Sequence, residues 1–254
     1  MSARPGQPDL TDSCDLTLCV DHKAPLAELA ASLHAVCDRA EEDSQRGAGV
    51  VVIRLGTIPP DDRSWPVDAE TQQVNRWEKA VRRLERLTAV SVAVAESTCG
   101  GPALDLLLVS DYRIATPDLR LLLPVSGGRL WPGMGVHRLV NQVGVAAGRQ
   151  LLMWGAELTA QRAQQMDLVD EITTVPSEAV RSAALLLGRA AGRDLAVLRQ
   201  LILEAPTTAY EDALGVHLAA CDREIRRRRG PDGADRRGLD GADQGAADRE
   251  RTER

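Results

Sequence analysis

An aspartate inside a run of leucines is the residue of this sequence most readily associated with chemistry. Asp105 follows Leu104 and precedes Leu106–Leu108, a pattern typical of a buried helix. An unpaired carboxylate is costly to bury because it loses its hydration. We therefore expect Asp105 either to make a buried hydrogen bond or to face a site where it exchanges a proton.

The segment before this aspartate has the residues of a tight turn. The run Val90–Ala95 is typical of a buried strand, and Cys99-Gly100-Gly101-Pro102 follows shortly after it. Glycine allows another group to approach the backbone closely, and Pro102 suits the first position of a helix. The pattern predicts a strand, a turn and a helix that carries Asp105.

The cysteines and histidines show no metal or disulfide pattern. None of the five cysteines forms a Cys-x-x-Cys pair, and none of the four histidines lies in a His-Glu-x-x-His motif. We expect unpaired thiols in a reducing compartment, and no metal ion.

Composition excludes several classes of function. The chain has 254 residues, a net charge of −6, no Phe and 2% aromatic residues. Few aromatic side chains argue against stacking on single-stranded nucleic acid, and the negative charge argues against binding phosphate backbones. No apolar run approaches the roughly 20 residues of a membrane span, and the first residues lack a signal-peptide pattern. We expect a cytoplasmic protein with no nucleic-acid or membrane partner.

Alternating strands and helices are predicted to position these residues, which indicates an α/β fold. A β-α-β unit is predicted over residues 15–55, with its helix beginning at Pro25. The further predicted elements are a helix at 70–87, strands at 90–95, 112–115 and 119–123, a Gly-rich loop at 124–135, helices at 135–153, 159–167, 177–192, 193–203 and 208–225, and a short apolar piece at 168–173.

The predicted domain organisation has four parts. Residues 1–13 form a loose N-terminus, 14–155 an α/β core and 156–225 a helical C-terminal module. Residues 226–254, rich in Gly, Ala, Asp and Arg, form a charged tail that we expect to be disordered because it has almost no large apolar side chains.

Residues 88–172 resemble the crotonase (enoyl-CoA hydratase/isomerase) superfamily. The resemblance lies in four motifs in order: the Gly-Gly turn that opens a helix, Asp-Tyr-Arg-Ile-Ala at 111–115, Pro-Gly-x-Gly at 132–135, and G-x-x-L-T-A-Q-x-A-x-x-x-x-L-V-D at 155–170. With the β-α-β unit, it covers about residues 14–225. It implies a crotonase-like ββα spiral whose C-terminal helices make oligomer contacts, in a trimer or hexamer.

Four segments are more similar to one divergent branch, the auxiliary hydratase-like proteins of dihydroxyphenylglycine biosynthesis (DpgB-like). They are WEKAVRRLERL, CGGPALD, WPGMGVHRLV and TTAYEDALGVHLAACDR. The likeness implies a protein that assists a type III polyketide synthase in making 3,5-dihydroxyphenylacetyl-CoA from malonyl-CoA. Its partners would be the synthase and a CoA-thioester substrate, with no cofactor beyond the CoA of the substrate. A non-catalytic partner of the synthase and an ordinary enoyl-CoA hydratase are the alternatives.

The resemblance also implies an oxyanion hole at the Gly-Gly turn. Crotonase chemistry polarises the thioester carbonyl with two backbone N–H groups. The position of one donor falls on Pro102, which has no N–H. The donor would then be the amide of Gly101 or Ala103, or the hole is degraded; the other donor would lie within 57–70. The alternative is a turn with a structural role alone.

Hydratases of this family use two glutamates as general acid and base. The first position matches Asp105, and the second falls on Val125, so a standard two-carboxylate hydration is not expected. A single-residue proton shuttle at Asp105 remains as an interpretation, beside a structural buried hydrogen bond. Glu96 is a weaker candidate for the missing carboxylate, and a surface charge is the favoured interpretation for it.

The loop over the acyl group is expected to supply the substrate-binding residues Trp131, Gly133 and Val125. Trp131 and Trp65 are the expected aromatic walls of a pocket for a ring-forming substrate, although Trp131 could equally be a loop anchor. The remaining candidates with weaker support are Asp111, expected to be structural, Arg129 on the same loop, and His137, expected to be a satisfied polar residue.

Overall fold

The computed structural model describes residues 16–44, 49–59, 62, 64–66, 69–126, 128–154, 157–187 and 192–229. The chain forms two compact units that divide between Arg199 and Gln200. The expected N-terminal segment 1–13 and most of the expected tail lie outside the described residues.

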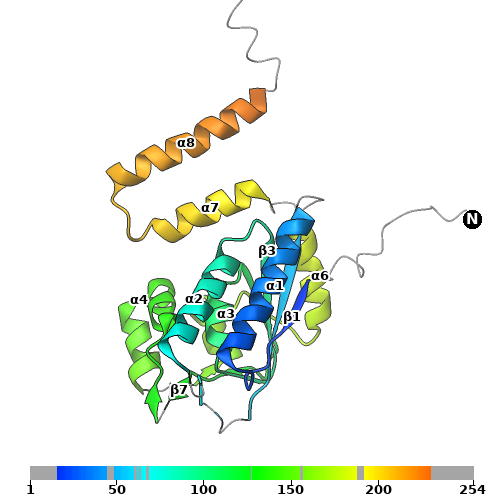
Figure 1. The fold of residues 1–254 in the computed structure, drawn as a ribbon, viewed down its shortest axis with the longest axis vertical. Helices are drawn as coiled ribbons and strands as arrows, with labels where there is room; N and C mark the ends of the chain where they lie inside the picture. Colours follow the sequence, from blue (N-terminus) through cyan, green and yellow to red (C-terminus); the bar gives the residue numbers. More distant parts are fainter. Residues whose placement is uncertain are drawn as a thin grey trace, which may run out of the picture. The chain divides into compact units, whose positions relative to one another are not determined.

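A five-stranded parallel sheet forms the centre of the first unit (Figure 1). In spatial order its strands are β1 (Thr17–Cys19), β2 (Val50–Leu55), β3 (Val90–Ala95), β5 (Tyr112–Ala115) and β10 (Glu171–Ile172). Its two longest strands, β2 and β3, are the continuous apolar runs that the sequence predicts, and both of their faces are covered.

The two faces of the sheet pack against different helices. Val51, Ile53 and Leu55 of β2 face a core shared with α1 (Leu26–Ser44), α2 (Thr71–Glu85) and α3 (Ala103–Val109). Val50 and Val52 face the opposite side, where α6 (Pro176–Leu187) packs. The alternation follows from the two-residue period of a strand.

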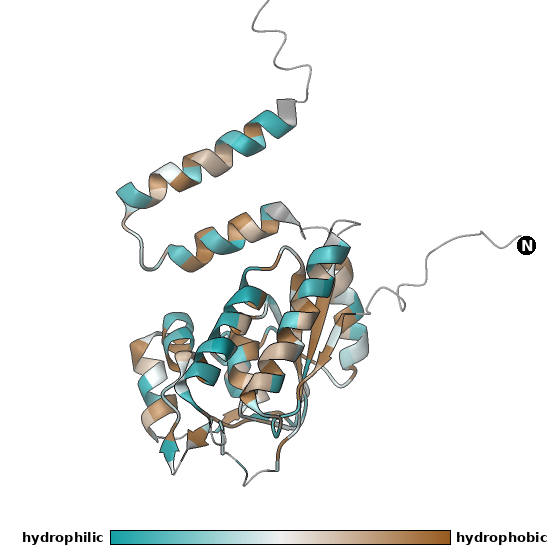
Figure 2. Cartoon of the chain, viewed as in Figure 1, coloured by the Kyte–Doolittle hydropathy of each residue, from teal (hydrophilic) through white to brown (hydrophobic). Residues whose placement is uncertain are grey.

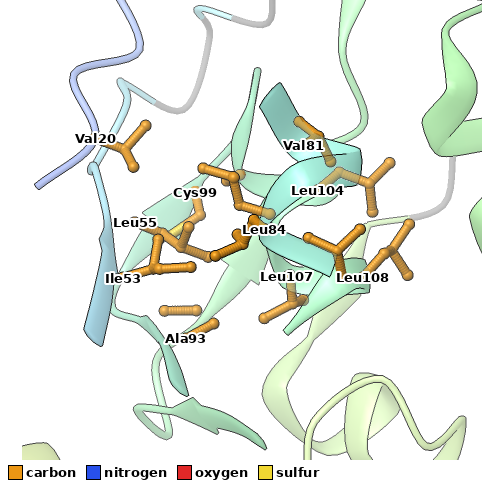
Figure 3. Close-up of a cluster of buried hydrophobic side chains, with 14 of the residues drawn as sticks. Val20, Ile53, Leu55, Val81, Leu84, Ala93, Cys99, Leu104, Leu107 and Leu108 are labelled. Atoms are coloured by element: carbon orange, nitrogen blue, oxygen red, sulfur yellow. The ribbon is translucent and has the colours of Figure 1, made fainter. Parts of the chain in front are cut away.

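The larger of these cores is mostly aliphatic, and its aromatic members are Trp65 and Trp77. Figure 3 shows Ile53, Leu55 and Ala93 of the sheet packed toward Leu84 of α2 and Leu107 of α3. This packing holds α2 and α3 together, and α3 is the helix that carries Asp105.

The remaining elements are distributed over the two units, with α8 in the second. The Gly-rich loop contains a short antiparallel pair, which the sequence pattern does not predict, and helix α4 is interrupted at Gly144, where φ is 77°. The elements are β4 (Thr98–Cys99), β6 (Arg120–Leu121), β7 (Val125–Ser126), β8 (Arg129–Leu130), α4 (Met134–Trp154), β9 (Leu158–Thr159), α5 (Ala160–Gln165), α7 (Arg193–Glu204) and α8 (Tyr210–Arg229).

Two predicted boundaries differ from the structure. Residues 157–187 lie in the first unit, not in a separate module from 156, because β10 pairs with β5 and α6 covers the sheet. Helix α8 continues through Arg229, so the first four residues of the predicted tail are helical. An Asp222–Arg226 ion pair at 2.8 Å spans one helical turn at this point.

The described helices include none that is both long and apolar enough to cross a membrane. Helix α8 has apolar residues among its polar ones (Figure 2), and several of these apolar side chains are exposed. They are Tyr210, Leu214, Val216, Leu218 and Ile225.

Candidate active site

Asp105 lies in the first turn of α3 and is almost completely buried. Its Oδ2 atom accepts a hydrogen bond of 3.1 Å from the indole Nε1 of Trp77, on α2. Its Oδ1 atom accepts one of 3.2 Å from the guanidinium of Arg138, on α4. The carboxyl group is therefore not an unpaired buried charge, since it has a partner on each side.

Arg138 is shared between two carboxylates. Its second terminal nitrogen donates a hydrogen bond of 2.9 Å to Oε2 of Glu78, the residue next to Trp77. The three charged side chains expose only 10% (Arg138), 7% (Asp105) and 18% (Glu78) of their surface. Two carboxylates and one guanidinium thus form a largely buried group whose formal charge is −1 when all three ionise.

The pKa of Asp105 is raised from 3.8 to about 6, mainly because the carboxyl group is buried and next because of the charge of Glu78. Arg138 and the indole N–H of Trp77 act in the opposite direction, because both stabilise the ionised form. The carboxyl group can therefore change its protonation state close to neutral pH.

A narrow pocket opens beside Asp105, with room for little more than a water molecule. Among the described residues that line it, Asp105 is the one ionisable side chain. The other lining residues are apolar or glycine: Gly101, Leu104, Leu123, Pro124, Leu130, Trp131, Gly133, Gly135, Val136 and Leu152.

Two glycines allow the walls of the pocket to approach each other. A Cβ atom at Gly133 would lie 2.5 Å from Nε1 of Trp131. A Cβ atom at Gly135 would lie 2.8 Å from Oδ1 of Asp105. The Pro-Gly-x-Gly motif thus places α4 in direct contact with both the aromatic wall and the carboxyl group.

The Gly-Gly turn also reaches the pocket, through Gly101. Its φ of +57° is a conformation that favours glycine, and a Cβ atom at this position would lie 3.1 Å from the ring of Trp65. The Ala103 amide donates to the carbonyl of Gly100 at 3.1 Å, so this N–H is used within the turn. Within the described part of the chain, the Gly101 amide has no hydrogen-bond acceptor.

The structure brings four of the six predicted site residues to this pocket: Gly101, Asp105, Trp131 and Gly133. Ala103 and Val125 are not among its lining residues. Val125 lies on β7, where it pairs with Leu130 and its carbonyl accepts a bond of 3.1 Å from the Trp65 amide.

The prediction of Trp65 as a pocket wall is wrong in this structure. Its ring is 3% exposed and packs edge-on against Trp77, with the ring centroids 6.0 Å apart. Trp65 thus supports the indole that holds Asp105, instead of lining the pocket itself.

The weaker candidates are not among the residues that line the pocket. Glu96 forms a partly exposed ion pair with Arg54 at 3.3 Å. Asp111 accepts hydrogen bonds from the backbone amide and the hydroxyl of Ser91 and from Arg199. These bonds connect β3 to α7, so Asp111 has a structural role. His137 is exposed beside Asn141, and Arg129 is exposed on β8.

Sequence reasoning missed three residues of the site: Trp77, Glu78 and Arg138. Trp77 belongs to the apolar stripe of α2, which predicts burial but not a bond to Asp105. Glu78 and Arg138 stand in WEKAVRRLERL and WPGMGVHRLV, two of the segments that carry the resemblance to the divergent branch. Nothing in these segments marks the two residues as partners of Asp105, because their contacts depend on how α2 and α4 pack against α3.

Comparison with known proteins now adds to this geometry. A family model described as enoyl-CoA hydratase/isomerase matches residues 66–222. The chain belongs to the enoyl-CoA hydratase/isomerase family. A relative from Amycolatopsis orientalis described as an enoyl-CoA hydratase is 42% identical over 214 residues, which are 84% of this chain and 97% of the relative.

Solved structures of enoyl-CoA hydratase/isomerase family proteins share the fold. One from Silicibacter pomeroyi is 18% identical, has a TM-score of 0.67, and the match covers 82% of this chain and 94% of that one. One from Marinobacter aquaeolei is 18% identical and has a TM-score of 0.66, and the match covers 86% of this chain and 89% of that one. The α/β architecture of this family member is therefore the crotonase fold.

Proposed function

We propose that this family member acts on a CoA thioester and assists a type III polyketide synthase. The reaction would be dehydration and aromatisation toward 3,5-dihydroxyphenylacetyl-CoA, in the biosynthesis of dihydroxyphenylglycine for glycopeptide antibiotics. Family membership and the 42% identical hydratase relative support the thioester substrate. The four segments similar to the DpgB-like branch support the acyl group and the synthase as partner.

The observation that carries the proposal is one buried carboxyl group on the wall of an otherwise apolar pocket. A hydratase that uses two glutamates needs a second carboxylate, and Val125 stands at that position. A single carboxyl group suits an elimination in which it takes the proton α to the thioester carbonyl and then gives that proton to the departing hydroxyl, which leaves as water. Formation of an aromatic ring supplies the driving force.

The turn at Gly101 would stabilise the enolate formed in this step. Gly101 has a left-handed backbone conformation and lines the pocket, and its amide is not used within the turn, unlike the amide of Ala103. We therefore assign the oxyanion donor to Gly101. Trp131 and Gly133 would form the wall against the acyl ring, and the pocket, which is narrow in this structure, would have to widen to admit that ring.

A second candidate function is a non-catalytic partner that binds the synthase or its thioester product. The observation that favours it is the engagement of Asp105, whose two oxygens already accept bonds from Trp77 and Arg138. In this role the site would bind an intermediate without moving a proton.

The test is reconstitution of the synthase with malonyl-CoA, with and without this protein. We expect the protein to stimulate formation of the dihydroxyphenylacetyl product and Asp105→Asn to abolish the stimulation, while circular dichroism shows the variant folded. Full stimulation by a folded Asp105→Asn variant would overturn the catalytic role and leave the binding role. Hydration of crotonyl-CoA at a measurable rate would instead identify an ordinary hydratase.

A further inference from the structure

The group formed by Asp105, Arg138 and Glu78 has a feature that the proton shuttle alone does not use. Arg138 bridges the two carboxylates through different nitrogens, at 3.2 Å to Asp105 and 2.9 Å to Glu78. Glu78 does not line the pocket, whereas Asp105 does. One carboxylate therefore faces the pocket and the other lies behind the guanidinium.

An arginine paired with Asp105 alone would hold its carboxylate permanently ionised. Opposite charges in contact favour the charged form, and an arginine does not give up its proton under ordinary conditions. If the carboxylate of such a pair accepted a proton, the buried guanidinium would keep its positive charge without a negative partner, which is costly. A lone ion pair is a poor acid or base.

Glu78 changes this balance. With Glu78 ionised, the guanidinium keeps a counter-charge when Asp105 takes up a proton, and the buried group passes from −1 to neutral. Asp105, at 7% side-chain exposure, is buried more deeply than Glu78 at 18%, so its charge loses more hydration. The added proton is therefore expected on Asp105.

We propose that Glu78 is a positioning residue that acts through Arg138 to keep Asp105 able to gain and lose a proton; the inference rests on the acid–base function proposed for Asp105. The charged groups that face Asp105 are Glu78 from α2 and Arg138 from α4, and its other polar contact, Trp77, is uncharged. The negative charge of Glu78 favours the protonated form of Asp105. This agrees with the raised pKa of Asp105, for which the charge of Glu78 is the second cause after burial.

The test measures the protonation of Asp105 directly, independent of catalysis. The protein is labelled with ¹³C at the aspartate carboxyl carbons, the Asp105 signal is assigned by its loss in Asp105→Asn, and it is titrated by NMR. We expect Glu78→Gln to lower the Asp105 midpoint by about one pH unit, because a neighbouring negative charge is removed. Arg138→Gln should raise it by a similar amount.

Glu85→Gln is the matched control. Glu85 lies two turns further along α2, is buried to a similar degree and pairs with Arg82 at 3.8 Å. This variant should leave the Asp105 midpoint in place. An unchanged or higher midpoint in folded Glu78→Gln would overturn the proposal, as would an equal shift in Glu85→Gln.

The same variants separate this inference from the proposed function. If Glu78→Gln moves the midpoint and Asp105→Asn still stimulates the synthase, the charge arrangement holds and the catalytic role fails. If the catalytic role holds, the pH profile of stimulation should move with the NMR midpoint in Glu78→Gln. Should Arg138→Gln not fold, Arg138→Lys keeps the positive charge and is expected to leave the midpoint near that of the wild type.

Discussion

At the scale of single residues, Asp105 shows what a sequence reveals about a buried carboxyl group. The leucines around it correctly predict burial, and burial predicts a partner. The partners themselves, Trp77 and Arg138, come from helices that precede and follow α3 in the chain. They could not be predicted, because the pairing depends on how α2, α3 and α4 pack and not on local sequence.

Burial of Asp105 should make the stability of the fold depend on pH. Its pKa in the folded protein is about 6, above the ordinary value of 3.8, so the folded state binds more protons between about pH 4 and pH 6. The free energy of unfolding therefore falls as pH rises through this window. We expect Asp105→Asn to lose this component, which amounts to up to about 3 kcal/mol for a shift of this size.

Chemical denaturation at pH 4 and at pH 7 measures this component. The change in unfolding free energy between the two values is compared for the wild type and Asp105→Asn, so that contributions from other groups cancel. An equal change in both proteins would show that Asp105 ionises in the folded state at its ordinary pKa. Glu96→Gln, which alters an exposed carboxylate, serves as the control.

At the scale of elements, the long runs were predictable and the short pairings were not. The β-α-β unit follows from an alternating strand and a helix with apolar residues at helical spacing. The buried strands β2 and β3 follow from continuous apolar residues, because both of their faces are covered. Ladders of two residues, such as β7 with β8, leave no periodic signal. The break in α4 is likewise set by one residue, Gly144, in an otherwise helical pattern.

One buried arginine attaches helix α7 to the sheet. Arg199 donates to both carboxylate oxygens of Asp111, at 2.8 and 2.6 Å, and to the backbone carbonyls of Leu87 and Ala89. Asp111 in turn accepts from the Ser91 amide on β3. The loop before β3, the end of α3 and α7 are thus joined at a single guanidinium.

Removal of this arginine should destabilise the first unit strongly. Arg199→Gln leaves Asp111 half-buried without its counter-charge and two carbonyls without a donor, so we expect a loss of about 3 to 5 kcal/mol in the free energy of unfolding. Urea denaturation monitored by tryptophan fluorescence measures it. Arg226→Gln, which breaks an exposed pair on α8, should change the unfolding free energy by less than about 1 kcal/mol. Similar values for the two variants would contradict the structural role given to Arg199.

At the scale of the whole molecule, the two units differ in how well they bury their apolar residues. The first unit encloses its sheet on both faces. Helix α8 of the second unit carries Leu214, Leu218, Cys221 and Ile225 at helical spacing along one stripe, all exposed. Water-exposed apolar stripes of this kind mark association surfaces. The trimer or hexamer predicted from the family resemblance would use this stripe.

A charge in the middle of the stripe should therefore weaken self-association. We expect the wild type to have the mass of an oligomer in light scattering after size-exclusion chromatography, and Leu218→Glu to shift toward the monomer, because a carboxylate at an apolar contact loses hydration without a partner. Ala219→Glu places the same charge away from the stripe and should keep the mass of the wild type. A monomeric wild type, or an unchanged mass in Leu218→Glu, would exclude α8 as the oligomer contact. The helix would then require a different partner, and the synthase is the first to test by measuring whether Leu218→Glu weakens its binding.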